Sequence, residues 1–282
     1  MPAHPLTNLP TLTLAITTHE RPEALAAILK SLRSQSYAPS EVLIADDGSG
    51  AATTEVIAAF KSQSPYPVKY LRQEHQGFRV ARLRNLAIAA ASFDYLLLID
   101  GDMLLHPEFI ADHIKMACHG YYTQGLRVQL SSQRTTSLIK EPTKLPNFFD
   151  RNLGLRRLHT LHCATLQPLL RYIGNKLIAI KSCNQAFWRE DLLKINGFNE
   201  LIEGWGAEDK ELCARLEHSG IRRQTLLGGG IAFHLYHPPA ERIRRKENEA
   251  IFQLTVLNKI LRCEQGVQAH IEALHVKITA QE

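Results

Sequence analysis

The stretch YLLLIDGDM at residues 95–103 decides the fold. Its apolar run, Tyr95–Ile99, is typical of a strand that is buried on both faces of a parallel sheet. Asp100, Gly101 and Asp102 follow the run at once, and ligands of open α/β sheets bind beyond the carboxyl ends of the strands. We therefore expect this segment to deliver two carboxylates to a binding site at one edge of a sheet.

Three further apolar runs precede this segment: Leu12–Ile16, Glu41–Ala45 and Val68–Leu71. Helical patterns fill the gaps between them. Pro22 suits the first turn of a helix, and apolar residues recur at helical spacing from there to Leu32. Strands that alternate with helices indicate βαβ units, so we predict an α/β fold with a mostly parallel sheet.

The Asp-Gly-Asp triplet has two interpretations. It can be a simple turn, since Asp and Gly are favoured at strand ends. Alternatively, Asp100 and Asp102 bind a hard divalent cation such as Mn²⁺ or Mg²⁺, which relieves the repulsion between two neighbouring carboxylates. The sequence GIAFHLYHPP offers His234 and His237 at the end of a predicted strand, Ile231–Leu235, and a neutral imidazole suits Mn²⁺. A lone histidine there is otherwise a hydrogen-bonded core residue.

The segment Trp205-Gly206-Ala207-Glu208-Asp209 places two carboxylates at the start of a predicted helix. Acidic residues are favoured there because they complement the helix dipole, so capping is one explanation. Helix capping does not explain why Trp205 lies between two glycines. An aromatic ring beside two carboxylates suits a sugar acceptor, because the ring can stack on the sugar and a carboxylate can take a proton from its hydroxyl.

Seven segments, in this order, resemble family 2 glycosyltransferases with the GT-A fold, and the C-terminal ones resemble the galactosyltransferase and chondroitin-synthase module. They are TLAITTHERP near 11–22, VLIADDGSG at 42–50, HQGFRVARLRNLAIAAA at 75–91, YLLLIDGDM at 95–103, SCNQAFWREDLLKINGFNE at 182–200, WGAEDKEL at 205–212 and HLYHP at 234–238. The first loop departs from the family's usual Tyr-Asn pair. The resemblance implies a Rossmann-like nucleotide-binding half, an acceptor-binding half, a helical insertion and a C-terminal helix.

The resemblance also implies roles for individual residues. The donor, a uridine diphosphate sugar, would be surrounded by Thr17, Glu20, Asp46 or Asp47, Arg84, Asp100 and Asn184. The metal, Mn²⁺ or Mg²⁺, would be bound by Asp100, Asp102, His234 and His237, with Asp102 the direct ligand and His234 preferred over His237. Asp209 would be the catalytic base, Glu208 would orient the acceptor, and Trp205 would stack on it. The implied reaction is an inverting transfer of a hexosyl or N-acetylhexosaminyl group to a hydroxyl of a glycan or glycolipid, in cell-surface polysaccharide or lipopolysaccharide biosynthesis.

We divide the chain into four parts: a donor half at 1–119, a basic and mainly helical insertion at 120–176, a metal and acceptor half at 177–239, and an amphipathic helical segment at 240–282. A strand is expected at Leu177–Ile180. Residues 127–194 hold 12 Lys or Arg against 4 Asp or Glu, so the net charge of +5 is concentrated there. With the basic start of the 241–261 pattern, this predicts reversible contact with an anionic membrane surface; a helix packed on the catalytic domain is the alternative.

Composition excludes several classes of protein. With 45% hydrophobic and 22% charged residues the chain is ordinarily globular rather than disordered. Five cysteines without a C-x-x-C pair argue against a disulfide framework, and we expect a cytoplasmic protein without a membrane span or export signal. A Rossmann dehydrogenase would need G-x-G-x-x-G after the first strand. A non-catalytic carbohydrate-binding or nucleic-acid-binding module would not need the carboxylates at separate strand and helix ends, and we expect no nucleic-acid partner.

Overall fold

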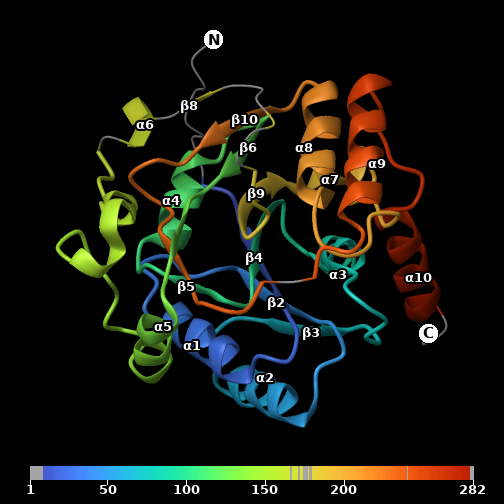
Figure 1. The fold of residues 1–282 in the computed structure, drawn as a ribbon. Helices are drawn as coiled ribbons and strands as arrows, with labels where there is room; N and C mark the ends of the chain where they lie inside the picture. The colour runs from blue at the N-terminus through green and yellow to red at the C-terminus, as the bar shows by residue number, and fades with distance from the viewer. Residues whose placement is uncertain are drawn as a thin grey trace.

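The computed structural model describes residues 9–165, 167–170, 172–173, 177, 180–239 and 241–279. A mixed sheet runs through the centre with helices on both faces (Figure 1). Its strands lie in the order β3 (Val68–Arg72), β2 (Glu41–Asp46), β1 (Leu12–Thr18), β4 (Tyr95–Asp100), β9 (Asn184–Trp188), β6 (Tyr121–Gln124), β10 (Arg222–Thr225) and β8 (Tyr172–Ile173). The first four strands are parallel, and β9 is antiparallel to both of its neighbours. The four apolar runs predicted as strands are therefore confirmed.

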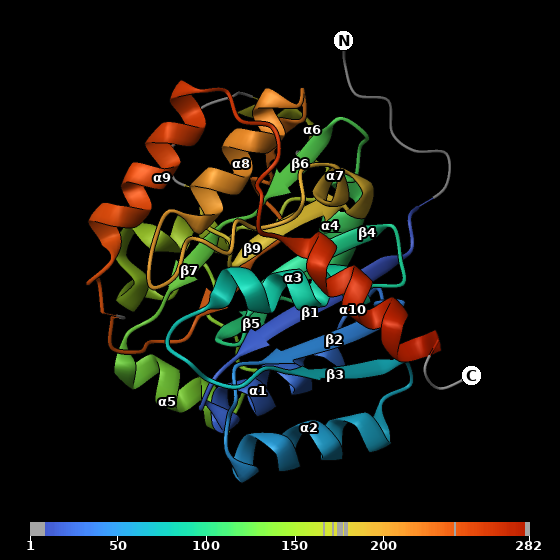
Figure 2. The ribbon, with the colours of Figure 1, turned by 90° about the vertical axis from the view of Figure 1, so that its right-hand side faces the viewer.

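Each central strand is buried on both faces, as its continuous apolar sequence requires. Leu14 and Ile16 of β1 pack with α1 (Pro22–Leu32), α2 (Ala51–Gln63) and α4 (Phe109–Met116). Ala15, between them, packs on the opposite face with α3 (Val80–Ala90), α7 (Arg189–Lys194), α8 (Glu208–His218) and α10 (Val267–Thr279). Figure 2 shows α3 and α10 over one face and α1 and α2 on the other. The alternation follows from the two-residue period of a strand.

A small second sheet positions part of the site. It has the order β5 (Met103–Leu105), β11 (Ala232–His234) and β7 (Arg127–Gln129). His234 pairs with Met103, and the Leu235 amide donates to the Asp102 carbonyl at 2.9 Å. This pairing brings a late strand against the residue that follows the Asp-Gly-Asp triplet.

The middle of the chain differs from the expectation of a mainly helical insertion. Residues 121–129 contribute β6 to the central sheet and β7 to the small one. Helical structure follows in α5 (Ser132–Lys140), the 3₁₀ helix η1 (Arg151–Thr160) and α6 (Gln167–Leu170). Residues 178 and 179 of the strand expected at Leu177–Ile180 lie outside the described residues. The strand beside β4 is β9, whose apolar run AFW is too short to have been recognised.

The C-terminal pattern forms two helices rather than one. Helix α9 (Arg245–Leu257) packs on α8 through Phe252 and Ala214, and α10 packs against α3 through Val267. The expected alternative of a helix packed on the domain therefore describes α9. Within the described ranges, no helix combines the length and the apolar character that crossing a bilayer requires.

Candidate functional site

A cavity of about 790 Å³ opens at the carboxyl ends of β1 and β4 and extends to the start of α8. The strand register explains why: Thr17 pairs with Asp100, and Thr18 pairs with Asp46, so the polar ends of three strands lie at one edge. Most of the predicted site residues line this cavity: Thr17, Asp47, Arg84, Asp100, Asp102, Trp205, Glu208, Asp209, His234 and His237. Side chains separated by more than two hundred residues in the sequence thus share one cavity.

Asp102 and the two histidines form a cluster in the cavity wall. The Nε2 atoms of His237 and His234 lie 3.3 Å and 3.6 Å from Asp102 Oδ2. The ligand atoms of all three side chains lie within 4.8 Å of one another. Both histidines therefore face the same carboxylate.

The cluster fits a divalent cation such as Mn²⁺. Asp102 Oδ1 is buried and has no hydrogen-bond partner in the described part of the chain, and an orphaned carboxylate oxygen in a protein interior needs a positive or donor group. Burial, followed by repulsion from Asp100, raises the pKa of Asp102 to about 7. Burial also lowers the pKa of His234 to about 4, which keeps its imidazole neutral and able to coordinate a metal.

A guanidinium group already contacts this cluster. Arg21 Nη1 lies 3.1 Å from Asp102 Oδ2, and Arg21 Nη2 donates to the Tyr236 carbonyl at 3.2 Å. Sequence reasoning did not assign Arg21 to the site, although it lies only one residue beyond Glu20 in the first loop. Its charge partly offsets that of Asp102.

Asp100, which we expected in the metal site, lies beside this cluster and pairs elsewhere. Its Oδ1 accepts from Arg84 Nη2 at 3.0 Å and from the Thr17 hydroxyl at 3.2 Å. Arg84 Nη1 in turn lies 3.2 Å from Glu208 Oε1. Burial would lower the pKa of Arg84, but the two carboxylates outweigh that effect and raise it, so the guanidinium stays charged. Arg84 therefore links the end of β4 to the start of α8.

Glu208 and Asp209 begin α8 after a left-handed residue, Ala207, at φ 73°. Both carboxylates line the cavity: Glu208 pairs with Arg84, and Asp209 accepts from the Lys210 amide at 2.8 Å. Burial, followed by repulsion from Glu208, raises the pKa of Asp209 to about 7. A carboxylate with this pKa is suited to accept a proton near neutral pH.

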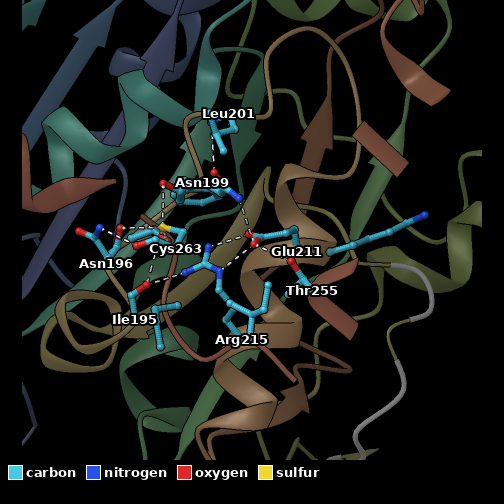
Figure 3. Close-up of polar contacts among 12 residues, drawn as sticks. Ile195, Asn196, Asn199, Leu201, Glu211, Arg215, Thr255 and Cys263 are labelled. Atoms are coloured by element: carbon cyan, nitrogen blue, oxygen red, sulfur yellow. Dashed lines mark hydrogen bonds and ion pairs between the residues drawn. The ribbon is translucent and has the colours of Figure 1, made fainter. Parts of the chain in front are cut away.

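A buried network fixes α8 from its other side (Figure 3). Arg215 and Glu211 are fully buried and form a two-pronged ion pair, at 2.7 and 2.9 Å. Arg215 also donates to the Ile195 carbonyl at 2.6 Å, and the Thr255 hydroxyl of α9 donates to Glu211 at 3.1 Å. The network joins α8 to α9 and to the loop after α7, so the first turn of α8 is held in a defined position.

Trp205 lies at the cavity mouth with 38% of its surface exposed. The Arg242 guanidinium stacks over its ring at 4.6 Å. The ring is therefore placed as a platform should be, but a cation covers one of its faces. Arg242 and Arg245 both line the cavity; from the sequence they were interpreted only as the basic start of the 241–261 pattern.

The opposite end of the cavity contains Asp47, His19 and His75. Asp47 Oδ2 lies 2.9 Å from His75 Nδ1, and the rings of His19 and His75 stack with their centres 4.2 Å apart. The Asp47 carbonyl lies 2.8 Å from His19 Nδ1. Neither histidine was singled out from the sequence; the signal available was the position of each in a loop after a predicted strand.

Three predicted donor-binding residues do not line the cavity within the described residues. Asp46 is fully buried and accepts from Ser49 and from the Tyr70 hydroxyl, because the last residue of β2 points away from its successor Asp47. Glu20 accepts from the Gly50 amide at the start of α2. Asn184 was expected in a loop near the donor sugar. It instead lies in β9, fully buried, with bonds to His113 and to the carbonyls of Leu126 and Gly230.

Two protein-family models match the parts of the chain that form most of this cavity. The model of glycosyl transferase family 2 matches residues 13–172, more than half of the chain. The chain belongs to this family. The model of the N-terminal domain of galactosyltransferase matches residues 161–238, which include the start of α8 and both clustered histidines.

The relatives include bacterial polymer synthases. The chain is 26% identical to the chondroitin synthase of Escherichia coli, over 84% of this chain and 36% of the relative. It is 29% identical to validoxylamine A glucosyltransferase of Streptomyces hygroscopicus subsp. limoneus, over 76% of this chain and 49% of the relative. It is 27% identical to the hyaluronan synthase of Pasteurella multocida, over 84% of this chain and 25% of the relative. The chain thus spans at most about half the length of these relatives.

Solved structures share the fold. A mannosyltransferase, PcManGT from Pyrobaculum calidifontis in complex with GDP-Man and Mn²⁺, matches with a TM-score of 0.61 at 18% identity over 91% of this chain and 67% of that one. The structure of S. aureus TarS 1–349 in complex with UDP matches with a TM-score of 0.58 at 14% identity, over 92% of this chain and 68% of that one. The chain therefore has the mixed α/β fold of GT-A glycosyltransferases, as the sequence predicted.

Proposed function

We propose that the chain transfers a sugar from a UDP-sugar to a hydroxyl group of a glycan or glycolipid, with inversion at the anomeric carbon and with Mn²⁺ or Mg²⁺ as cofactor. One observation carries the proposal: a single cavity is lined both by the Asp102, His234 and His237 cluster and by Asp209, a carboxylate with a pKa near neutrality. Family membership supplies the reaction class.

We assign the donor nucleotide to the part of the cavity that is lined by Thr17, Asp47, His19 and His75. A nucleobase fits this end because it offers hydrogen-bonding edges to Asp47 and a flat face to an imidazole ring. The UDP in the TarS structure supports a uridine nucleotide, whereas the GDP-Man in the mannosyltransferase shows that the fold also accepts a guanosine donor. Asp102, His234 and His237 would bind the cation, which when bound neutralises charge on the diphosphate leaving group.

Asp209 removes the proton from the acceptor hydroxyl. Its raised pKa makes it a strong enough base for an alcohol while it stays substantially ionised at neutral pH. Glu208 is ion-paired with Arg84. We therefore assign Glu208 to orienting the acceptor and not to the proton transfer. Attack by the hydroxyl on the face of the sugar opposite the leaving group inverts the configuration in a single displacement.

The acceptor and the biological setting belong to the same proposal. The chondroitin and hyaluronan synthases among the relatives support a hexosyl or N-acetylhexosaminyl donor and a role in making a cell-surface polysaccharide. We place the reaction on the cytoplasmic side, where the donor would be available. The donor half would comprise residues 1–119, and the metal and acceptor half residues 177–239.

Isothermal titration of the purified protein with UDP, with and without Mn²⁺, tests the proposal. We expect binding that requires the cation, and release of UDP from a UDP-sugar when an acceptor is supplied from a panel of glycans. Absence of cation-dependent UDP binding would contradict the donor class. A carbohydrate-binding module would instead bind glycans without any response to UDP or Mn²⁺.

A further inference from the structure

A row of exposed apolar side chains lies on η1 and at its ends. Leu155 is 82% exposed, Leu158 54% and Leu161 46%, and Phe149, just before the helix, is 84% exposed. The segment projects from the body of the molecule in Figure 1, in yellow-green between the labels α5 and α6. Clustered exposed apolar residues of this size mark a contact surface for another molecule.

The row is a consequence of the local geometry. Gly154 breaks the 3₁₀ helix with a positive φ of 55°, and a new turn begins at Leu155. Side chains three residues apart eclipse one another in a 3₁₀ helix, so Leu155 and Leu158 fall on one line, and Leu161 follows directly after the helix. The segment is anchored from behind by Leu153, which is buried with Leu138 of α5.

Basic side chains border this row. Residues 144–161 contain Lys144, Arg151, Arg156 and Arg157 but a single acidic residue, Asp150, and Lys144 is paired with Glu141 at 2.7 Å. Asp150 is already paired with Arg134 of α5, at 3.4 Å. Across the described chain, none of the three arginines of η1 has a carboxylate within ion-pair distance, although the Arg157 guanidinium lies over the Phe148 ring at 5.3 Å.

We propose that η1 and its flanks, residues 148–161, dock on the surface of an anionic phospholipid membrane. The apolar row would enter the interface between headgroups and acyl chains, and the arginines would lie at the level of the lipid phosphates. Each basic residue near such a surface is attracted to it, and the attraction weakens with salt. Charge complementarity decides for this partner, because a leucine row bordered by arginines without a carboxylate partner matches an apolar layer beneath anionic headgroups.

This surface is connected to the rim of the cavity. Arg156 Nη1 donates to the Gln129 carbonyl at 3.4 Å, and Gln129 of β7 lines the cavity. A further exposed apolar side chain, Ile243, follows Arg242, and Arg242 lines the cavity. Docking would therefore hold the cavity close to the lipid surface, and this inference rests on the proposed function in specifying a lipid-linked acceptor.

Vesicle co-sedimentation tests the docking surface independently of catalysis. The full chain is mixed at low salt with vesicles of phosphatidylcholine alone or with about a third phosphatidylglycerol. We expect recovery with anionic vesicles only, and a loss of about tenfold or more in apparent affinity for the double variant Leu155→Glu/Leu158→Glu. The matched control is Leu257→Glu on α9, where the leucine is 77% exposed and lies in the 241–261 pattern, for which the sequence left membrane contact and packing on the domain as alternatives.

Each result bears on the assignment. Equal recovery of the unmodified protein with neutral and anionic vesicles, or unchanged binding of the double variant, would overturn it. Loss of vesicle binding in Leu257→Glu alone would show that α9 contacts the membrane, and would likewise overturn the assignment to η1. Light scattering reports the oligomeric state. If the unmodified protein is a dimer that does not bind vesicles, and the double variant is a monomer, this face is an interface between copies of the chain and the membrane assignment is overturned. Titration of each variant with UDP and Mn²⁺ reports separately on the proposed function and on folding.

Discussion

Two buried carboxylates in one cavity have pKa values raised to about 7 for the same principal reason, burial, yet their surroundings differ. Asp102 has one oxygen without any partner in the described chain, and its other oxygen faces Arg21 and two imidazoles. Asp209 accepts a hydrogen bond from its own helix and lies beside Glu208, whose charge is held by Arg84. The comparison teaches that a raised pKa does not define a role: the arrangement at Asp102 suits a cation, and the arrangement at Asp209 suits a proton.

The largest effect should follow from Asp209→Asn. An amide cannot accept the proton of the acceptor hydroxyl, so we expect kcat to fall by about 10²–10⁴-fold or more. Titration with UDP and Mn²⁺ should be unchanged, because the cation cluster lies elsewhere in the cavity. Glu208→Gln is the matched control, and it should mainly raise the KM for the acceptor. Substantial turnover by a folded Asp209→Asn protein would remove Asp209 from the role of base.

Asp102→Asn should have the complementary effect. The amide loses the charge that offsets a divalent ion, so we expect UDP affinity in the presence of Mn²⁺ to fall by about 10–100-fold. His234→Ala and His237→Ala should each weaken it less, because the other two ligands remain. Calorimetry measures all three, and binding of UDP without cation provides the baseline. An unchanged affinity in Asp102→Asn would contradict the ligand assignment.

Arg84→Lys tests the connection between the two carboxylate sites. One ammonium group cannot reproduce the two separate guanidinium contacts to Asp100 and Glu208, so we expect roughly tenfold lower kcat/KM and a lower melting temperature. Arg215→Lys is the matched control, because it removes a similarly buried fork outside the cavity. The control should lose stability with little change in activity at a temperature where both variants are folded. Equal loss of activity in both would show that Arg84 acts through stability alone.

The smallest effect concerns stability and pH. The folded-state pKa of Asp209, about 7, exceeds the ordinary value of 3.8, so the native protein binds more protons than the unfolded chain between these values and loses stability as pH rises through that window. Asp209→Asn removes this loss. We expect its melting temperature to exceed that of the unmodified protein by a few degrees at pH 8, with the gain shrinking towards pH 4. If the carboxylate acts mainly as a helix cap, the variant would instead be less stable at pH 8.

The pH dependence of activity has the opposite sign. Because Asp209 must be ionised to act as a base, kcat/KM should rise with pH and level off above about 7. Measurement at fixed, saturating Mn²⁺ separates this ionisation from proton competition at the cation cluster. A flat profile from pH 5 to 8 would contradict the assignment of base.

Much of the architecture was predictable from local patterns. The parallel strands, the helix after Pro22 and the Asp-Gly-Asp triplet at a strand end follow from apolar runs and from the polar residues that end them. Strand β9 and the strands at 121–129 were not recognised, because they are short and their burial depends on neighbours distant in the chain. The same reason explains Asn184: its amide satisfies buried groups from three other segments, and no local pattern reveals that need.

The sequence by itself determined that this chain folds as an α/β protein with carboxylates at the ends of its strands, because strand and helix periods and turn residues act over a few positions. Only the tertiary structure decided which of those carboxylates reach the cavity. Asp47 lines it and Asp46 does not, because successive residues at a strand end point to opposite sides. His234 meets Asp102 because β11 pairs with β5, a contact between segments more than a hundred residues apart. Such pairings depend on how the whole core closes, and that information is not local to any segment.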